Sequence, residues 1–323
     1  MLRATTVTVT ITSDKAHTGY RHEALLYEGD QGFLDAVVPF VADGVARRQP
    51  VMVAVLAPRI AALRSALGDD VEGVSFVDMA ELGANPARII PAWQDFVKDA
   101  GPRTPAARGV GEPIWPGRGA DEIVECQLHE SLLNLAVGPD VPLWLVCPYD
   151  VQSLDAELVV EAHHCHPAVN EHNDYRGSVT YGGIYHAASM FGQPLAEPPG
   201  HADRLVLASL NDSGLLEWVQ TTATNAGLAA QRSEQLAAVT HRLALAGLRA
   251  THELVQVCWW VERSGVVLEV KDRAVLLDPM IGRRPGELET ARGRAVRTAN
   301  DVCDLVQVRS GGNGTTVRMH CKR

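Results

Sequence analysis

The side chains with the most local chemistry lie in the run GEPIWPGRGADEIVECQLHESLLN. Three of them follow a predicted strand, where open α/β sheets bind ligands. Three more stand at i, i+3 and i+7 of the helix predicted next, so they share one helix face. Two interpretations stand: the six line a ligand site, or the tryptophan packs the sheet end while the helix stripe meets solvent or a neighbouring domain. The first three residues are Glu112, Trp115 and Arg118, and the second three are Gln127, Glu130 and Asn134.

Further candidates stand near two other predicted strands. His22 and Glu23 come just before the first strand, and Asp150 follows Cys-Pro-Tyr at the end of a later one. Parallel strands end at one edge, so Glu112 and Asp150 are expected to share a rim. His22 reaches that rim only if the segment before it folds over. The run YEGDQGF lacks the GK[ST] ending of a phosphate loop, which excludes that motif.

Histidines cluster in the run HHCH. Adjacent residues on a helix point about 100° apart, so at most two of them share a site, such as His163 and His166. With His172 nearby, these are candidate ligands for a metal or haem, which would need a further ligand from the fold. The other interpretation is surface histidines at a helix end.

Residues 24–150 alternate between apolar strands and helices. The run at 51–56 is typical of a strand buried on both faces, and apolar residues recur at helical spacing across 33–45. The alternation predicts an α/β domain with a doubly wound parallel sheet. The expected strands are 25–27, 51–56, 74–77, 108–110 and 143–147, and the expected helices are 33–45, 60–67, 86–98 and 121–137. A last helix with a polar loop is expected at 151–172, and a return segment at 181–191.

A proline-rich stretch, QPLAEPPGH, separates this half from one with a different rhythm. There, helices accompany Val-rich and Trp-rich strands joined as hairpins, which predicts an α+β sandwich. We therefore expect a first domain at 1–195, a linker at 196–202 and a second domain at 203–323. The expected strands are 205–207, 254–262, 266–272, 305–308 and 315–320, and the expected helices are 214–226, 230–249 and 292–301.

Composition limits the classes of function. A chain of 323 residues favours two domains, and its net charge of -10 argues against nucleic-acid binding. No apolar run approaches the roughly 20 residues of a membrane span, and the first residues lack the pattern of a signal peptide, so a cytoplasmic location is expected. Six cysteines without a CxxC pair predict buried free thiols.

Six stretches between about residues 20 and 190 resemble the MEDS domain, a sensory module. The resemblance implies a fold similar to RecA-like and circadian-clock ATPases, and a role in sensing a small molecule. It leaves the ligand unnamed. The stretches are HEALLYEGDQGFLDAVVPFV, PVMVAVL, ELGANPARIIPAW, GEPIWPGR, CQLHESLLNLA and CPYD.

Residues 203–321 resemble the GHKL ATPase superfamily, specifically anti-sigma-factor serine kinases of actinobacteria. The supporting stretches are THRLALAGLR, EVKDRAVLLDP, CDLVQVRS and GTTVRMH. The family helix reads approximately NELATNALRH, with a glutamate base and an asparagine that holds magnesium. Here Arg242 stands in place of the base and Ala246 in place of the magnesium ligand. Arginine cannot accept a proton and alanine has no oxygen, so both roles are lost.

The other family motifs are also altered. The adenine-reading DxG becomes Asp272-Arg-Ala274, and the glycine-rich lid is reduced to Arg-Gly293-Arg. Loss of base, metal ligand and lid together predicts a degenerate nucleotide site without kinase activity or a bound cofactor.

The sequence therefore predicts a non-catalytic signalling regulator. Its first domain senses a small molecule, and its second, a pseudo-ATPase of Bergerat (GHKL) type, binds a protein partner, a sigma factor or an anti-sigma antagonist. Two alternatives stay open: an active serine kinase that uses Asp272 and Gly293 with altered partners, and a metal-binding or haem-binding sensor. The sequence leaves open whether the chain forms a homo-oligomer.

Overall fold

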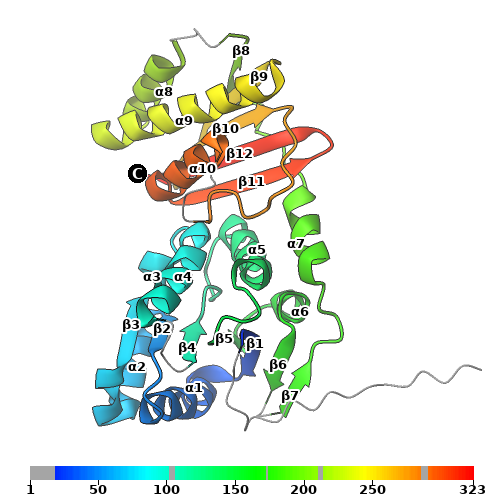
Figure 1. Cartoon of the computed structure of the whole chain (residues 1–323). Coiled ribbons are helices and arrows are strands. Elements are labelled where there is room, and N and C mark those ends of the chain that lie inside the picture. The colour runs from blue at the N-terminus through cyan, green and yellow to red at the C-terminus, as the bar shows by residue number, and fades with distance from the viewer. Residues whose placement is uncertain (1–18, 102–105, 172–173, 210–213, 285–289) are drawn as a thin grey trace, which may run out of the picture. The chain divides into compact units, whose positions relative to one another are not determined.

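The computed structural model describes residues 19–101, 106–171, 174–209, 214–284 and 290–323. The chain divides into two compact units (Figure 1). The first comprises Met1–Leu82 and Ala92–His186, and the second comprises Gly83–Pro91 and Ala187–Arg323.

A seven-stranded sheet with the order β3-β2-β4-β5-β1-β6-β7 forms the centre of the first unit. All neighbouring strands are parallel except β6 and β7, so the sheet is mixed. The predicted α/β class is confirmed. The strands are β1 (Arg21–Tyr27), β2 (Val51–Val55), β3 (Val74–Asp78), β4 (Ala107–Gly111), β5 (Leu143–Asp150), β6 (Ala168–Glu171) and β7 (Asp174–Gly177).

Two predictions for this sheet were wrong. The polar loop expected before residue 172 contains β6, because AVNE and DYRG are too short and too polar to show a strand period. His22 and Glu23 lie inside β1 rather than before it. All seven residues of RHEALLY are buried, and Arg21, His22 and Glu23 contact side chains that lie on the same face or far away in the sequence.

Helices enclose the sheet on both faces. On α1, Phe33, Val37 and Val41 recur at i, i+4 and i+8 and pack in one core with Leu25 of β1 and Val53 of β2. The periodic pattern predicted this helix and its buried face. The helices along this part of the chain are α1 (Gly29–Ala46), α2 (Ala57–Leu67), α3 (Met79–Leu82), α4 (Ile89–Ala100), α5 (Ala120–Ala136), α6 (Ala156–Cys165) and α7 (Gly183–Gly192), with short 3-10 turns η1 (Gly68–Gly73) and η2 (Pro86–Arg88).

The second unit contains a separate antiparallel sheet with the order β11-β12-β10-β9-β8. The two hairpins expected from the turn sequences are present as β9–β10 and β11–β12. The strands are β8 (Asp203–Leu207), β9 (Val255–Val261), β10 (Gly265–Asp272), β11 (Leu305–Gly311) and β12 (Gly314–Lys322), and the helices are α8 (Gly214–Asn225), α9 (Ala230–Thr251) and α10 (Ala291–Val302).

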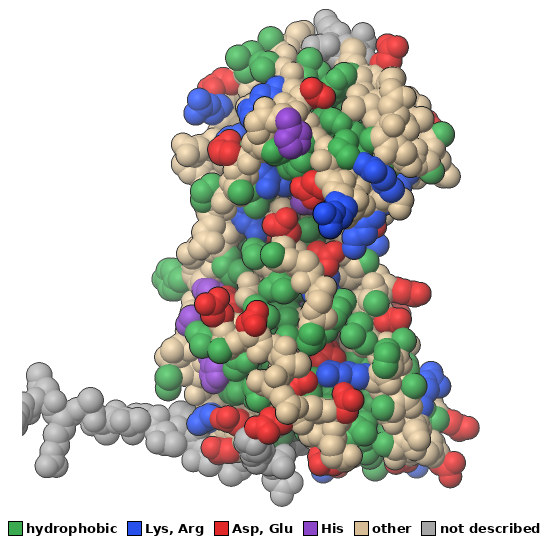
Figure 2. Space-filling view, turned by 180° about the vertical axis from the view of Figure 1, so that it is seen from behind, with side chains coloured by type: hydrophobic (Ala, Val, Ile, Leu, Met, Phe, Trp, Pro, Cys, Tyr) green, Lys and Arg blue, Asp and Glu red, His purple; other side chains and the backbone are tan. Residues whose placement is uncertain are grey.

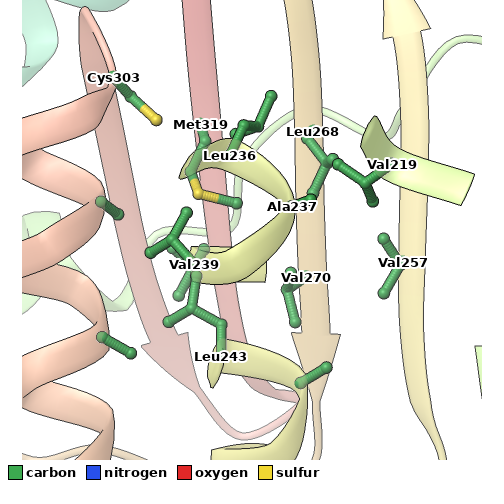
Figure 3. Close-up of a cluster of buried hydrophobic side chains, with 14 of the residues drawn as sticks. Val219, Leu236, Ala237, Val239, Leu243, Val257, Leu268, Val270, Cys303 and Met319 are labelled. Carbon is green, nitrogen blue, oxygen red and sulfur yellow. The ribbon is translucent and has the colours of Figure 1, made fainter. Parts of the chain in front are cut away.

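The core of this unit lies between its helices and one face of the sheet. Figure 3 shows Val239 and Leu243 of α9 beside Val270 of β10, with Met319 of β12 close to the same helix. Alternate residues of β10 face this core, as expected for a strand of period two.

The proline-rich stretch packs against the opposite face of the same sheet. Ala202 packs against the buried cluster of Cys258, Trp260 and Val267. Arg318 donates a hydrogen bond to the carbonyl of Ala196 at 2.5 Å. The expected linker therefore contributes to the fold of the second unit.

None of the helices in the described ranges is both long and apolar enough to cross a membrane.

Truncating the core of the second unit tests this packing. We expect Leu243→Ala to lower the free energy of unfolding by about 2–5 kcal/mol, since it removes a buried side chain and leaves a cavity. Urea unfolding followed by circular dichroism measures the change. As control, Leu254→Ala truncates a leucine that is 59% exposed and should change stability by no more than about 0.5 kcal/mol. Equal losses in the two variants would contradict the burial of Leu243.

Candidate functional site

Four buried polar side chains meet inside the first unit. They come from β1, α5, β5 and the residue that ends α6, and each is at most 1% exposed. Each offers one nitrogen, oxygen or sulfur atom, and these atoms lie within 4.8 Å of one another. We call this set the inner cluster: His22, Glu130, Cys147 and His166.

The elements place these side chains by simple periodicities. On β1, His22 and Ala24 point to the same face of the sheet, and Ala24 is in register with Cys147 of the parallel strand β5. On α5, Glu130 and Asn134 are four residues apart and therefore share one face. The parallel pairing and the helix face thus bring the four elements to one point.

Hydrogen bonds fix the orientation of the His22 ring. The Asn134 amide nitrogen donates to the Cys165 carbonyl at 2.8 Å, so its oxygen Oδ1 faces His22 Nδ1, at 3.1 Å. This oxygen can only accept, which means that Nδ1 carries the hydrogen. The other nitrogen of the neutral ring, Nε2, then carries a lone pair. It lies 3.1 Å from Glu130 Oε2 and 3.3 Å from Cys147 Sγ.

His166 is held in the same way. Its Nδ1 donates to the Ala162 carbonyl at 2.8 Å, so in the neutral ring Nε2 carries the lone pair. That nitrogen lies 3.2 Å from Glu130 Oε2. Neither His166 Nε2 nor Glu130 Oε1 has a hydrogen-bond partner among the residues that the structure describes.

The electrostatics follow from this burial. Burial lowers the pKa of His22, and the adjacent His166 lowers it further. Burial alone would raise the pKa of Glu130, but the close contacts of its carboxylate with His166 and His22 bring it below its ordinary value. Burial, together with the negative Glu130, raises the pKa of the Cys147 thiol. The inner cluster therefore favours the ionised carboxylate of Glu130. A second negative charge, on the Cys147 sulfur, is disfavoured unless a cation is present.

A second polar group, the rim group, comprises Tyr27, Arg59, Glu112 and Asp150. Tyr27 Oη donates to Glu112 Oε1 at 2.9 Å, and Arg59 forms an ion pair with the same carboxylate. Burial raises the pKa of Glu112 to about 7, although Arg59 and Tyr27 act in the opposite sense, and the charge of Asp150 adds to the rise. Asp150 itself accepts hydrogen bonds from the Gly29 amide and the Ser153 hydroxyl. Glu112 and Asp150 follow or end neighbouring parallel strands.

The remaining candidates of the first unit lie outside both groups. Glu23 points to the opposite face of the sheet from His22 and pairs with Arg21 at 2.6 Å. The Arg118 guanidinium lies over the Trp115 ring, 4.3 Å from its centroid. Gln127 is half-buried and offers its backbone carbonyl to Cys165 Sγ.

Of the histidine run, only His166 is grouped with the inner cluster. His163 is half-buried, and its carbonyl accepts a hydrogen bond from the Ser178 hydroxyl. His172 lies outside the described residues. A further half-buried group consists of Glu161, His164 and His186, in which both rings contact the carboxylate.

In the second unit, the candidate residues lie around the end of β10. Asp272 is buried there and forms an ion pair with Arg292 at 2.9 Å. Ala274 donates its amide to Asp272 Oδ1 at 2.8 Å. The others lie on helices: Arg242 (exposed) and Ala246 (half-buried) on α9, and Gly293 (buried) on α10.

The comparison with protein families bears on the unit that holds the inner cluster. Residues 21–167 match the MEDS family. The family is described as the methanogen/methylotroph, DcmR sensory domain. The matched range contains all four residues of the inner cluster and all four of the rim group, and it confirms the resemblance inferred for this part of the chain.

Comparisons with other collections of proteins add little. The search of curated proteins found no match. Two crystal structures of Oryza sativa TDC, one with PLP and one with PLP and tryptamine, share 12% and 13% identity at TM-scores of 0.27 and 0.23. They align with 96% and 88% of this chain, which spans 66% and 63% of theirs. TM-scores this low do not establish a shared fold.

The pH dependence of stability tests the environment of Glu112. Its pKa is raised from 4.5 to about 7, so the folded state holds the proton that the unfolded chain releases. Relative to Glu112→Gln, the wild type should therefore lose stability as pH rises from about 4.5 through about 7, by on the order of 3 kcal/mol. Urea unfolding of both proteins across this range measures the difference.

Asp150→Asn provides the control. The pKa of Asp150 is lowered: burial opposes the change, and hydrogen bonds from Gly29 and Ser153 outweigh it. The stabilising contribution of Asp150 is lost only as pH falls through its pKa in the folded state. The difference in unfolding free energy between wild type and Asp150→Asn should therefore not change with pH near neutrality. A flat profile for the Glu112 comparison would contradict the burial of that carboxyl.

Proposed function

We propose that this protein is a non-catalytic signal-transduction regulator. The match to a sensory domain indicates a signalling role for the first unit. In our proposal, that unit senses a small molecule, and the second unit is a pseudo-ATPase of GHKL type that binds a protein partner. The partner class is a sigma factor or an anti-sigma antagonist.

The arrangement of the second unit supports a GHKL frame. Helices α8, α9 and α10 pack on one face of the antiparallel sheet (Figure 1), and we assign the long helix α9 to the place of the family's catalytic helix. There, Arg242 and Ala246 stand where base and magnesium ligand are required. Neither side chain can perform those roles.

The buried ion pair between Asp272 and Arg292 is the observation that carries the non-catalytic part of the proposal. Both side chains are almost fully buried, at 3% and 7% exposure. In the family, this aspartate reads the adenine amino group, for which its carboxylate must be available. Removing one partner of a buried pair typically costs about 3–5 kcal/mol, so a nucleotide base would have to offset that loss.

The helix packing around Asp272 supports the same conclusion. A side chain at Gly247 would place Cβ 2.8 Å from Asp272 Oδ2, so α9 lies tightly against the carboxylate. Gly293 belongs to the first turn of α10, and its amide donates to the Thr290 hydroxyl at 3.0 Å. In our proposal, the remnant of the glycine-rich lid is thus the capped start of a helix.

A protein is the better class of partner for this surface. Leu277 and Val275, in the segment after β10, are 91% and 53% exposed, and in our proposal they form part of the contact. On the face shown in Figure 2, basic side chains stand beside acidic ones, and the chain carries a net charge of -10. Both features oppose binding to nucleic acid. A signal in the first unit would then act by shifting the population of the partner-competent state.

Calorimetry with ATP and magnesium tests the pseudo-ATPase. We expect no heat of binding beyond that of dilution, because the base, the metal ligand and the adenine-reading carboxylate are absent or engaged. A dissociation constant in the micromolar range would contradict the proposal. Transfer of labelled phosphate from ATP to a copurified partner would establish the alternative, an active serine kinase.

Capture of partners from a native cell extract, followed by mass spectrometry, tests the partner class. We expect a sigma factor or an anti-sigma antagonist to be retained, and Leu277→Asp to reduce its recovery at least tenfold by placing a charge in the contact. Leu254→Asp, which charges an exposed leucine before β9, should retain the partner. Recovery of metabolic enzymes alone, or equal recovery with both variants, would contradict this assignment.

A further inference from the structure

The inner cluster is short of positive charge. Two imidazole lone pairs, a carboxylate and a thiol converge in a region from which water is excluded. The thiol hydrogen of Cys147 can satisfy His22, but the contact between His166 Nε2 and Glu130 Oε2 still needs a proton or another cation between two acceptors. An uncompensated carboxylate in such surroundings is strongly unfavourable.

We propose that His22, Glu130, Cys147 and His166 bind one divalent transition-metal ion, for which zinc is the best match. Two imidazoles, one thiolate and one carboxylate are ligands that Zn²⁺ accepts in four-coordinate sites, and the mixture of nitrogen and sulfur disfavours magnesium or calcium.

The distances fit a tetrahedral shell. Zinc bonds of about 2.0–2.3 Å place neighbouring ligand atoms about 3.4 Å apart for nitrogen and oxygen, and about 3.6 Å apart for nitrogen and sulfur. The corresponding separations are 3.1 Å from His22 Nε2 to Glu130 Oε2, 3.2 Å from His166 Nε2 to the same oxygen, and 3.3 Å from His22 Nε2 to Cys147 Sγ. Shifts of a few tenths of an ångström would admit the ion.

The charges also balance. A thiolate and a carboxylate together neutralise a divalent cation, so the filled site would be uncharged in the interior of the unit. Binding breaks the S–H bond of Cys147, forms the metal–sulfur bond and releases one proton to solvent, as is usual for thiol ligands. Affinity should therefore rise with pH.

The surroundings already orient the ligands. Asn134 and the Ala162 carbonyl accept the Nδ1 hydrogens of His22 and His166, an arrangement typical of outer-shell partners in metal sites. The Tyr20 ring stacks on His22, and the Tyr149 ring meets the edge of His166. These contacts exclude water and hold both rings with Nε2 pointing inward.

Cobalt(II) titration of the full chain tests the site, with protein purified without a histidine tag and stripped by a chelator. We expect uptake of one equivalent, visible bands of tetrahedral cobalt, and a near-ultraviolet charge-transfer band that reports a thiolate ligand. Zinc should displace the cobalt. Elemental analysis of freshly purified protein should find about one transition-metal ion per chain.

Cys147→Ser should abolish the charge-transfer band and weaken binding by more than about a hundredfold, since it removes a direct ligand, whereas outer-shell partners alone are worth 10–100-fold. Cys126→Ser is the matched control: its cysteine is equally buried in α5 but hydrogen-bonds to the Pro113 carbonyl, so the band should persist. Circular dichroism establishes that both variants are folded.

His186→Ala separates the inner cluster from the half-buried group of Glu161, His164 and His186, and should leave the affinity unchanged. Failure to take up cobalt or zinc, or binding that survives Cys147→Ser and is lost in His186→Ala, would overturn the proposal. In the former case the cluster is a protonated hydrogen-bond network.

The idea that the metal ion is the sensed signal rests on the proposed function. The metal site and the regulatory function can be contradicted separately. If metal binds as described but partner recovery is the same with stripped and loaded protein, the site stands and the ion is not the signal. If no metal binds while the partner is retained, the site fails and the regulator remains.

Discussion

The interior of the first unit depends on how the Glu130 carboxylate is neutralised. It is buried on α5, and both imidazoles that approach it offer lone pairs in their neutral forms. The same carboxylate connects β1, α5 and the end of α6, so its charge state affects three elements together. A cation at this point would stabilise their packing, and its loss would leave hydrogen-bond acceptors facing one another.

The sheet explains why such a centre exists in a hydrophobic unit. A central parallel strand is covered on both faces, so polar residues in it must find buried partners. On β1, Glu23 meets Arg21 on one face, and His22 meets the inner cluster on the other. The first pair joins a guanidinium to a carboxylate, whereas in the second group the lone pairs of two neutral imidazoles face a carboxylate. That asymmetry distinguishes a structural ion pair from a candidate ligand site.

Much of the fold could be predicted from patterns within single elements. The helical spacing of Phe33, Val37 and Val41 and the turn signals of the second half gave the α/β class and the antiparallel hairpins. β6 and β7 lack such a period, because their pairing within the sheet, not their composition, makes them strands. His22 was predicted outside β1 because a polar residue beside an apolar run resembles a boundary.

Except for the shared rim of Glu112 and Asp150, which follows from the ends of neighbouring parallel strands, the site was predicted only where one element carries it. Glu130 and Asn134 follow from helical spacing, but Cys147 resembles any buried thiol, and the pairing of His166 with His22 depends on strand register and on the end of α6. Tyr27 and Arg59 were not predicted for the same reason, because their contacts with Glu112 join three separate elements. Distances across a fold are not encoded in the spacing along one segment.

The two units differ in how their buried charges are neutralised, and this difference bears on the direction of the proposed signalling. In the second unit, Asp272 is paired with Arg292 by the chain itself, so a ligand there would have to break an existing contact. In the inner cluster, His166 Nε2 and Glu130 Oε1 have no hydrogen-bond partner in the described part of the chain, so a cation would gain contacts with both atoms. A ligand can shift an equilibrium only by its differential affinity for the two states. In the proposed function, the first unit is therefore the place where binding energy would drive a change, and the second would respond through a surface rather than through a nucleotide.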